Sequence, residues 1–150
     1  MKRRLAALAL ILMLPAAALA ADPVKITADQ FVVDDATHIA TFTGKVVVIR
    51  TNLTVWAPKV VVDYGDDGPS NIKSFVASGG VRIKTKEQDA TGDLAVYDPK
   101  AQTLKLTGHV MVINSSSTVG GPDLLIDLNT NVTTFTGGTD GRVTGVFTPQ

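Results

Sequence analysis

The sequence contains no cysteine, and this absence limits how the protein can be stabilised or attached to a membrane. Without a thiol the chain can form neither a disulfide nor a metal–thiolate site. A bacterial lipoprotein anchor also needs a cysteine at the end of the signal sequence, so that anchor is excluded. Stability must therefore come from burial of apolar surface and from backbone pairing.

Residues that favour helices and basic residues are also scarce. Glutamate occurs once, at Glu87, whereas valine and threonine are frequent and favour strands. No window shows convincing helical spacing of apolar residues. Without Lys2, Arg3 and Arg4, the chain has 11 Lys and Arg against 14 Asp and Glu, a net charge near −3. Nucleic-acid binding needs a basic surface, so this class of partner is not expected.

The first 20 residues have the composition of a secretory signal peptide. A basic start is followed by the uninterrupted apolar run 5–14 and by small residues at Ala18 and Ala20. We expect cleavage after Ala20, which leaves residues 21–150 as one domain. An uncleaved membrane anchor is the alternative, but the apolar run is short and is followed by Pro15. No later stretch is long enough to cross a bilayer.

A short motif with a hydroxyl residue before a glycine recurs along the chain. Its copies are residues 42–48, 77–83 and 106–112, followed by a shorter copy at 135–137. The glycines are 35, 29 and 29 residues apart, and the six additional residues of the first step fall in the turn-forming run 65–71. A fixed period whose insertion is confined to a loop is typical of stacked supersecondary units.

Alternate positions on either side of each glycine are apolar, as in strands with one buried face. The opposite face is mixed, and whether its apolar residues Val47, Ile49, Met111 and Ile113 pack on another sheet stays open. Glycine inside a strand often marks a bend or a bulge. Repeated at one register, it predicts a column of bends that folds a long sheet into two facing layers.

Few residues suggest catalysis or metal binding. His38 and His109 lie in strand-like sequence without acidic partners at ligand spacing, which favours a surface role. Asp63, Asp98 and Asp127 each follow a motif glycine by nineteen positions. They could be read as a calcium ladder, but isolated aspartates at strand ends are better explained as turn residues. No nucleophile, histidine and acid stand together, so we do not expect an enzyme, a cofactor or a metal site.

The signal-like start, the residues 26–30, the motif at 40–48, the segment 57–62 and the motif at 106–110 together resemble the OstA-like family. Within it, the chain is most similar to the LptA-like periplasmic lipopolysaccharide-transport proteins. The resemblance implies an all-β fold, a slightly open antiparallel β-jellyroll of two facing sheets. It also implies a periplasmic carrier that moves lipopolysaccharide from the inner to the outer membrane, with acyl chains inside and sugars outside.

The same resemblance implies the partners. They are lipopolysaccharide itself, related domains of the inner- and outer-membrane transport components, and further copies joined head to tail through edge strands. We expect the edge strands at residues 24–27 and 142–147, because an unpaired backbone edge can accept another strand.

A lipid carrier must keep acyl chains from water, because each exposed methylene costs about 0.8 kcal/mol and a dozen carbons about 10 kcal/mol. The apolar face of the repeats could supply the lining. The predicted lipid-binding residues are Val24, Ile26, Phe42, Val46, Val48, Val62, Ile83, Leu106, Val110, Val112, Ile126 and Phe135. The same residues could instead fill a closed core, and the sequence leaves both readings open.

Two other functions remain as alternatives. A secreted structural β-repeat scaffold would have a packed interior and would carry no lipid. A membrane-anchored sibling of the same transport system would retain residues 5–20 as an anchor.

Overall fold

The computed structural model describes residues 23–68, 70–139 and 141–149 of the chain, and within them the only regular elements are ten antiparallel strands of one sheet. The predicted signal peptide and its cleavage site lie outside the described residues. No described helix is long and apolar enough to cross a membrane. The strands are β1 (Lys25–Thr27), β2 (Gln30–Asp34), β3 (Ile39–Arg50), β4 (Leu53–Asp63), β5 (Ser74–Lys84), β6 (Gln88–Asp98), β7 (Thr103–Asn114), β8 (Ser117–Asp127), β9 (Val132–Thr136) and β10 (Thr144–Phe147).

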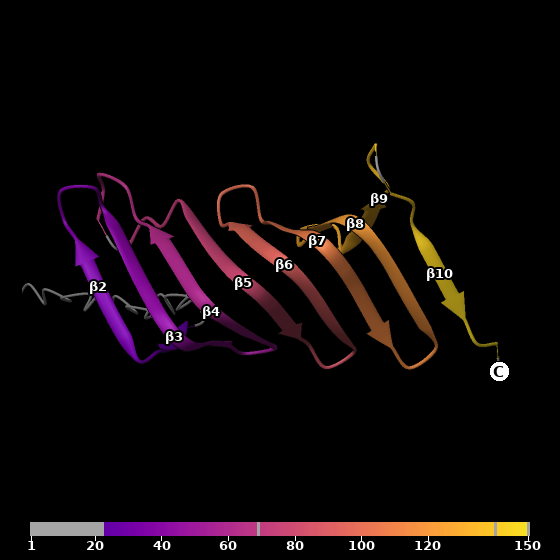
Figure 1. The fold of residues 1–150 in the computed structure, drawn as a ribbon. Helices are drawn as coiled ribbons and strands as arrows, with labels where there is room; N and C mark the ends of the chain where they lie inside the picture. The colour runs from indigo at the N-terminus through magenta and orange to yellow at the C-terminus, as the bar shows by residue number, and fades with distance from the viewer. Residues whose placement is uncertain (1–22, 69, 140, 150) are drawn as a thin grey trace, which may run out of the picture.

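The six long strands β3 to β8 form a meander in which each strand pairs with the next along the chain (Figure 1). Two short strands flank the meander at each side. β1 and β2 both pair with β3, and β9 and β10 both pair with β8. The described part of the chain therefore runs as a row of strands from β1 and β2 at one side to β9 and β10 at the other.

The motif glycines mark a column of bulges across the sheet. The register shifts between Thr43 and Val46 on β3, and at the equivalent places on β5 and β7. At each shift the strand that contains the repeated motif (β3, β5 or β7) has one residue more than its partner strand. Gly44, Gly79 and Gly108 have φ between 78° and 89°, a conformation that glycine adopts without steric cost. Because bulges bend a strand, the predicted column of bends is confirmed.

Each bulge divides a long strand into two arms, and apolar residues face the same interior from both. On β7 the buried residues are Leu104 and Leu106 before the bulge and Val110 and Val112 after it. The return strands β4, β6 and β8 lack the additional residue, so their buried parity switches at the bend. On β6 the buried Gly92 and Ala95 are three positions apart rather than two or four. The alternation in the sequence therefore predicted the inward-facing residues of these strands after the bend and missed those before it.

The interior is entirely apolar among the described residues, where no polar or charged side chain is buried. Its most deeply buried side chains are Leu106, Leu124, Val46 and Val60, each less than 2% exposed. Within the described residues no second layer covers the outer face: Ile49, Met111 and Ile113 are between 43% and 48% exposed, whereas Val47 is half-buried. Of the four apolar residues whose environment the sequence left open, three are therefore exposed to solvent and Val47 is partly covered.

Aspartates at strand ends fix the hairpin turns. The Asp98 carboxylate accepts hydrogen bonds from the backbone N–H groups of Lys100 and Ala101, at 2.9 and 3.0 Å. Asp127 caps the β8–β9 turn in the same way, and the Asp63 carboxylate accepts the N–H of Gly65. The interpretation of these recurring aspartates as turn residues is thus confirmed.

Candidate functional site

The inner face of the bent sheet contains a cleft of about 730 Å³. This is within the ordinary range for ligand pockets. Its walls are inward-facing apolar side chains of both arms of the sheet, and its rim is made of hairpin residues. The apolar wall residues are Val24, Val48, Leu53, Val55, Val60, Phe75, Ala77, Ile83, Ala90, Ala95, Tyr97, Leu104, Ile126 and Leu128.

A smaller cleft of about 330 Å³ lies toward the β1–β2 side. Val24 and Phe75 line both clefts, so the two adjoin along the sheet. Phe31 on β2 stacks on Phe42 of β3 with ring centroids 4.4 Å apart, and both rings line this smaller cleft. Together the clefts form an apolar trough, lined from β1 to the start of β9, that a chain-like apolar ligand could occupy.

The predicted lipid-binding residues fall into two groups. Seven of the twelve line a cleft: Val24, Ile26, Phe42, Val48, Val62, Ile83 and Ile126. Val46, Leu106, Val110 and Val112 line neither cleft and are at most 7% exposed within the core, and Phe135 packs against that core. Val62 and Ile83 fit both readings left open by the sequence, since they line a cleft and are also only 5% and 4% exposed within the core. Lipid contact itself remains a prediction for all twelve.

Sequence reasoning missed several residues of the cleft wall. Phe75 and Tyr97 lie on neighbouring strands with ring centroids 5.9 Å apart, and both line the larger cleft. Their alternation with Ala77 and Ala95 placed both on the predicted apolar face, but they were not included among the predicted lipid-binding residues. Val55 escaped notice for another reason, since it belongs to the first arm of a return strand, where the parity switches.

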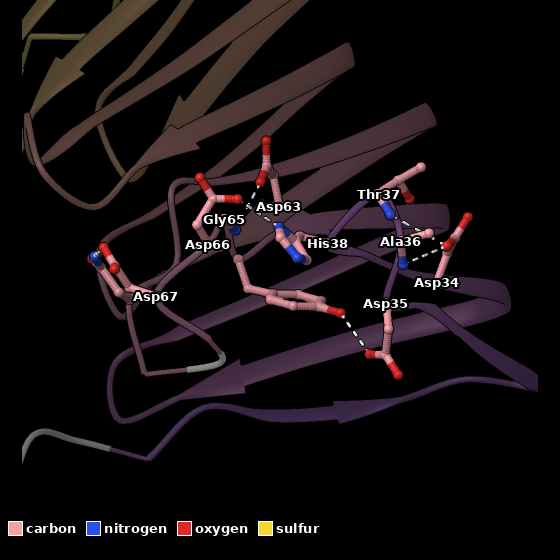
Figure 2. Close-up of polar contacts among 11 residues, drawn as sticks. Asp34, Asp35, Ala36, Thr37, His38, Asp63, Gly65, Asp66 and Asp67 are labelled. Carbon is pink, nitrogen blue, oxygen red and sulfur yellow. Dashed lines mark hydrogen bonds and ion pairs between the residues drawn. The ribbon is translucent and has the colours of Figure 1, made fainter.

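The two ends of the strands carry different charges. At one end are the turns that follow β2, β4, β6 and β8, and Figure 2 shows two of them side by side. His38 Nδ1 lies 2.9 Å from the Asp66 carboxylate, and the Tyr64 hydroxyl donates a hydrogen bond to Asp35. Partial loss of solvent, and then this hydrogen bond, raise the pKa of Tyr64 above its ordinary value.

At the opposite end are the hairpins β3–β4, β5–β6 and β7–β8. Arg50, Asn52 and the segment 85–88 form the rim of the larger cleft there. On the neighbouring outer face, Arg82 donates hydrogen bonds to Asp89 from Nε and Nη2, at 3.0 and 2.5 Å. These hydrogen bonds are the main reason that the pKa of Asp89 lies below its ordinary value. Arg82 also lies 5.4 Å from the Trp56 ring, so this aromatic serves surface packing.

Both histidines have acidic partners, although neither has an acid at metal-ligand spacing in the sequence. His109 Nδ1 is 2.8 Å from Asp93, and His38 makes the corresponding contact with Asp66. Asp93 lies opposite the bulge of β7 and Asp66 lies in the turn after β4, so the separation in sequence gave no sign of these contacts. The His109 side chain is 91% exposed, so the expected surface role agrees with its position.

The fold is therefore an open, β-jellyroll-like sheet whose two arms face an apolar trough. Residues 25–132 match the family model described as LptA/(LptD N-terminal domain) LPS transport protein. The chain belongs to this family, which confirms the resemblance to OstA-like, LptA-like proteins. The family is described by lipopolysaccharide transport and not by a catalysed reaction.

The chain is also similar to one individual protein sequence and to one solved structure. It is 28% identical over 103 residues to an uncharacterised protein of Rhizobium meliloti (strain 1021), an alignment covering 65% of this chain and 55% of that protein. The chain thus spans about half the length of this relative. The crystal structure of LptH from Pseudomonas aeruginosa, described as the LptA-homologous periplasmic component of the lipopolysaccharide transport device, superposes with a TM-score of 0.74. The identity is 19%, with 85% of this chain and 96% of that chain covered, so this likeness confirms the all-β jellyroll fold.

Proposed function

We propose that this protein is a periplasmic lipopolysaccharide carrier that holds acyl chains in the cleft of its bent sheet. The observation that carries the proposal is the apolar trough in a chain that belongs to a lipopolysaccharide-transport family. Burial of an acyl chain against such a wall offsets the cost of exposing it to water, about 0.8 kcal/mol for each methylene. The protein would thereby move lipopolysaccharide from the inner membrane toward the outer membrane.

The bridging role rests on the edges of the sheet. The strands β1 and β2 at one side and β9 and β10 at the other are paired on one edge within the described chain. Their outer edges can accept strands from a further copy or from related domains of the membrane-bound components. Head-to-tail assembly through these edges would give a continuous trough between the two membranes.

Export to the periplasm is part of the same proposal, with residues 1–20 removed as a signal peptide. N-terminal sequencing of the protein recovered from the periplasm should begin at Ala21. A start at Met1 together with recovery in the membrane fraction would favour the anchored sibling instead.

The test of lipid carriage is photocrosslinking from inside and outside the trough. A photoreactive phenylalanine analogue is placed at Phe42 or at Ile126, which line the two clefts, or at Met111 on the outer face as the control. With labelled lipopolysaccharide, we expect adducts from the cleft positions and little from the outer face. Equal labelling at all three positions, or none at the cleft positions, would contradict the proposal.

The structural-scaffold alternative is favoured by the closed part of the interior, where Leu106 and Leu124 are at most 1% exposed. The two functions differ in what the purified protein contains. A carrier isolated gently from cells should retain lipopolysaccharide detectable by mass spectrometry. A scaffold should be recovered without it and should not protect acyl chains added later.

A further inference from the structure

Charge is segregated between the two ends of the strands. We call the turns following β2, β4, β6 and β8 the acidic end; their residues 34–39, 63–74, 98–103 and 127–132 contain seven aspartates against two lysines. We call the hairpins at residues 50–53, 84–89 and 114–117 the basic end, where Arg50, Lys84 and Lys86 meet Glu87 and Asp89. Residues of both ends line the larger cleft: Arg50 and Lys86 are among those at the basic end, whereas the acidic end contributes Leu128 and Asn131 and none of its aspartates.

Two cations of the basic end border the cleft itself. Arg50 and Lys86 are exposed, and both line the larger cleft next to Val48, Leu53 and Ile83. They belong to neighbouring hairpins, because β4 pairs with β5. β3 and β5 are two strand spacings apart, about 10 Å, so one ligand group could lie between the two side chains.

The position of Lys86 is defined by its turn. The Thr85 hydroxyl oxygen accepts hydrogen bonds from the backbone N–H groups of Glu87 and Gln88, at 3.3 and 3.2 Å. The Thr85 N–H in turn donates to the Gln88 carbonyl at 2.9 Å. These hydrogen bonds fix the backbone of the turn, and they therefore hold the base of the Lys86 side chain at the rim of the cleft.

These cations are not neutralised within the described part of the chain. The ion pairs found there are Arg82–Asp89, His38–Asp66 and His109–Asp93, none of which includes Arg50 or Lys86. Asp89, the acid next along this hairpin, is already bound by Arg82. Glu87 is the one acidic side chain that shares the rim with them.

We propose that Arg50 and Lys86 form a phosphate-binding site at the basic end of the cleft, which reads the phosphorylated headgroup of the lipid whose chains occupy the trough. This inference rests on the proposed function and adds to it which headgroup chemistry the protein selects and at which end the headgroup lies. Guanidinium and ammonium groups make strong charge-assisted hydrogen bonds to phosphate. A phosphate at the opposite end would lie near aspartates instead of cations, which favours the orientation with the headgroup at Arg50 and Lys86.

The experiment compares two lipids that differ only in charge. Binding to the full chain is measured with hexa-acylated lipid A carrying its phosphates and with the same lipid after enzymatic dephosphorylation. We expect about tenfold tighter binding of the phosphorylated form, with a dependence on salt that the dephosphorylated form lacks. In the Arg50→Gln, Lys86→Gln double variant this preference should disappear, while binding of the dephosphorylated lipid stays unchanged.

Matched variants separate a local site from a general charge effect. Lys59→Gln, Lys105→Gln removes the same charge from exposed positions outside both clefts and should keep the preference. Glu87→Gln removes the repelling carboxylate from the rim and should strengthen binding of the phosphorylated lipid only. An equal loss in the two double variants would overturn the site.

The remaining outcomes are equally decisive. If the wild type binds both lipids equally, headgroup recognition is wrong while lipid carriage stands. If it binds neither lipid, the proposed function fails and the site fails with it. Inorganic phosphate distinguishes a lipid headgroup from a free anion: displacement of phosphorylated lipid A by modest phosphate would reassign the site to a free phosphate. Retention of the lipid in excess phosphate supports the headgroup.

Discussion

Gly108 on β7 lies directly against Asp93 on β6, so that a β-carbon added to Gly108 would come within 2.9 Å of the Asp93 β-carbon. Gly108 also has φ of 78°, which L side chains rarely adopt. The His109 ring next to it contacts the same aspartate. At the bend in β7 the Asp93 side chain thus packs against the Gly108 backbone, and an L side chain at this position would meet both this side chain and an unfavourable φ.

Substitution of this glycine is expected to cost more than substitution of a glycine with free space. Gly108→Ala should lower the free energy of unfolding by about 2–3 kcal/mol, from positive φ and overpacking together. Gly80→Ala, where φ is 96° but nothing lies within 4 Å, should cost about 1 kcal/mol. Urea unfolding of both variants measures the difference. Equal costs would mean that the contact with Asp93 is unimportant for the bend.

Substitutions in the core and in the cleft wall are expected to have different effects on stability and on lipid capture. Leu106→Ala removes a fully buried side chain and should destabilise the protein by about 2–5 kcal/mol. Ile126→Ala acts on the half-buried wall of the cleft and should cost about 1–2 kcal/mol, because less surface is involved.

The two variants should rank in the opposite order when lipopolysaccharide capture is measured instead of stability. At a temperature where both variants are folded, Ile126→Ala should weaken lipopolysaccharide capture and Leu106→Ala should not. Capture is measured by retention of labelled lipid on the immobilised protein. If both variants lost lipid only in proportion to their loss of folded protein, the wall position would have no role of its own.

The Arg82–Asp89 pair predicts a small pH dependence of stability. Since the pKa of Asp89 is lower in the folded protein, its stabilising contribution is complete above the ordinary aspartate value of about 3.9 and is lost as the pH falls through the folded value. Asp89→Asn should therefore cost up to about 1 kcal/mol near neutral pH, because the pair is partly exposed.

In acid below the folded pKa of Asp89, the difference between the wild type and Asp89→Asn should vanish, since both then lack the charged carboxylate. Unfolding by urea at the two pH values gives the comparison, with Asp123→Asn as a control at a position outside this ion pair. A penalty that is the same at both pH values would assign the effect to packing rather than to charge.

The repeat made much of the fold predictable. Glycines at a fixed period located the bends, and alternate apolar residues identified the inner face of β3, β5 and β7, because period-2 patterning reports burial directly. The parity switch in β4, β6 and β8 could not be read this way. It depends on which strand of each pair carries the additional residue, and only the pairing register reveals that.

The site was predictable only in part, for a related reason. Leu106 and Ile83 have the same sequence signature and both are buried in the core, yet only Ile83 also lines the cleft. Periodicity tells which face a side chain occupies but not how far apart the two arms lie above it. The rim residues Arg50 and Lys86 gave even less signal, since exposed hairpin cations are common in strand proteins.

The free edge of β10 allows the assembly proposal to be tested with a single backbone donor. The Thr148 N–H donates to the Ser116 carbonyl at 2.9 Å, so alternate N–H groups point toward β8. Those of Gly145 and Phe147 must then point to the free edge. Phe147→Pro removes an outward donor and leaves the β8 ladder intact, and the 70% exposed ring contributes little packing.

If copies join by adding strands at this edge, Phe147→Pro should shift the protein from oligomer to monomer in analytical ultracentrifugation over a range of concentrations. Phe147→Ala is the matched control, because it removes the ring but keeps the N–H group, and it should assemble as the wild type does. Val146→Pro should instead destabilise β10, since its N–H points to β8. Assembly that survives Phe147→Pro but is lost in Phe147→Ala would mean that the ring, and not the strand edge, joins the copies.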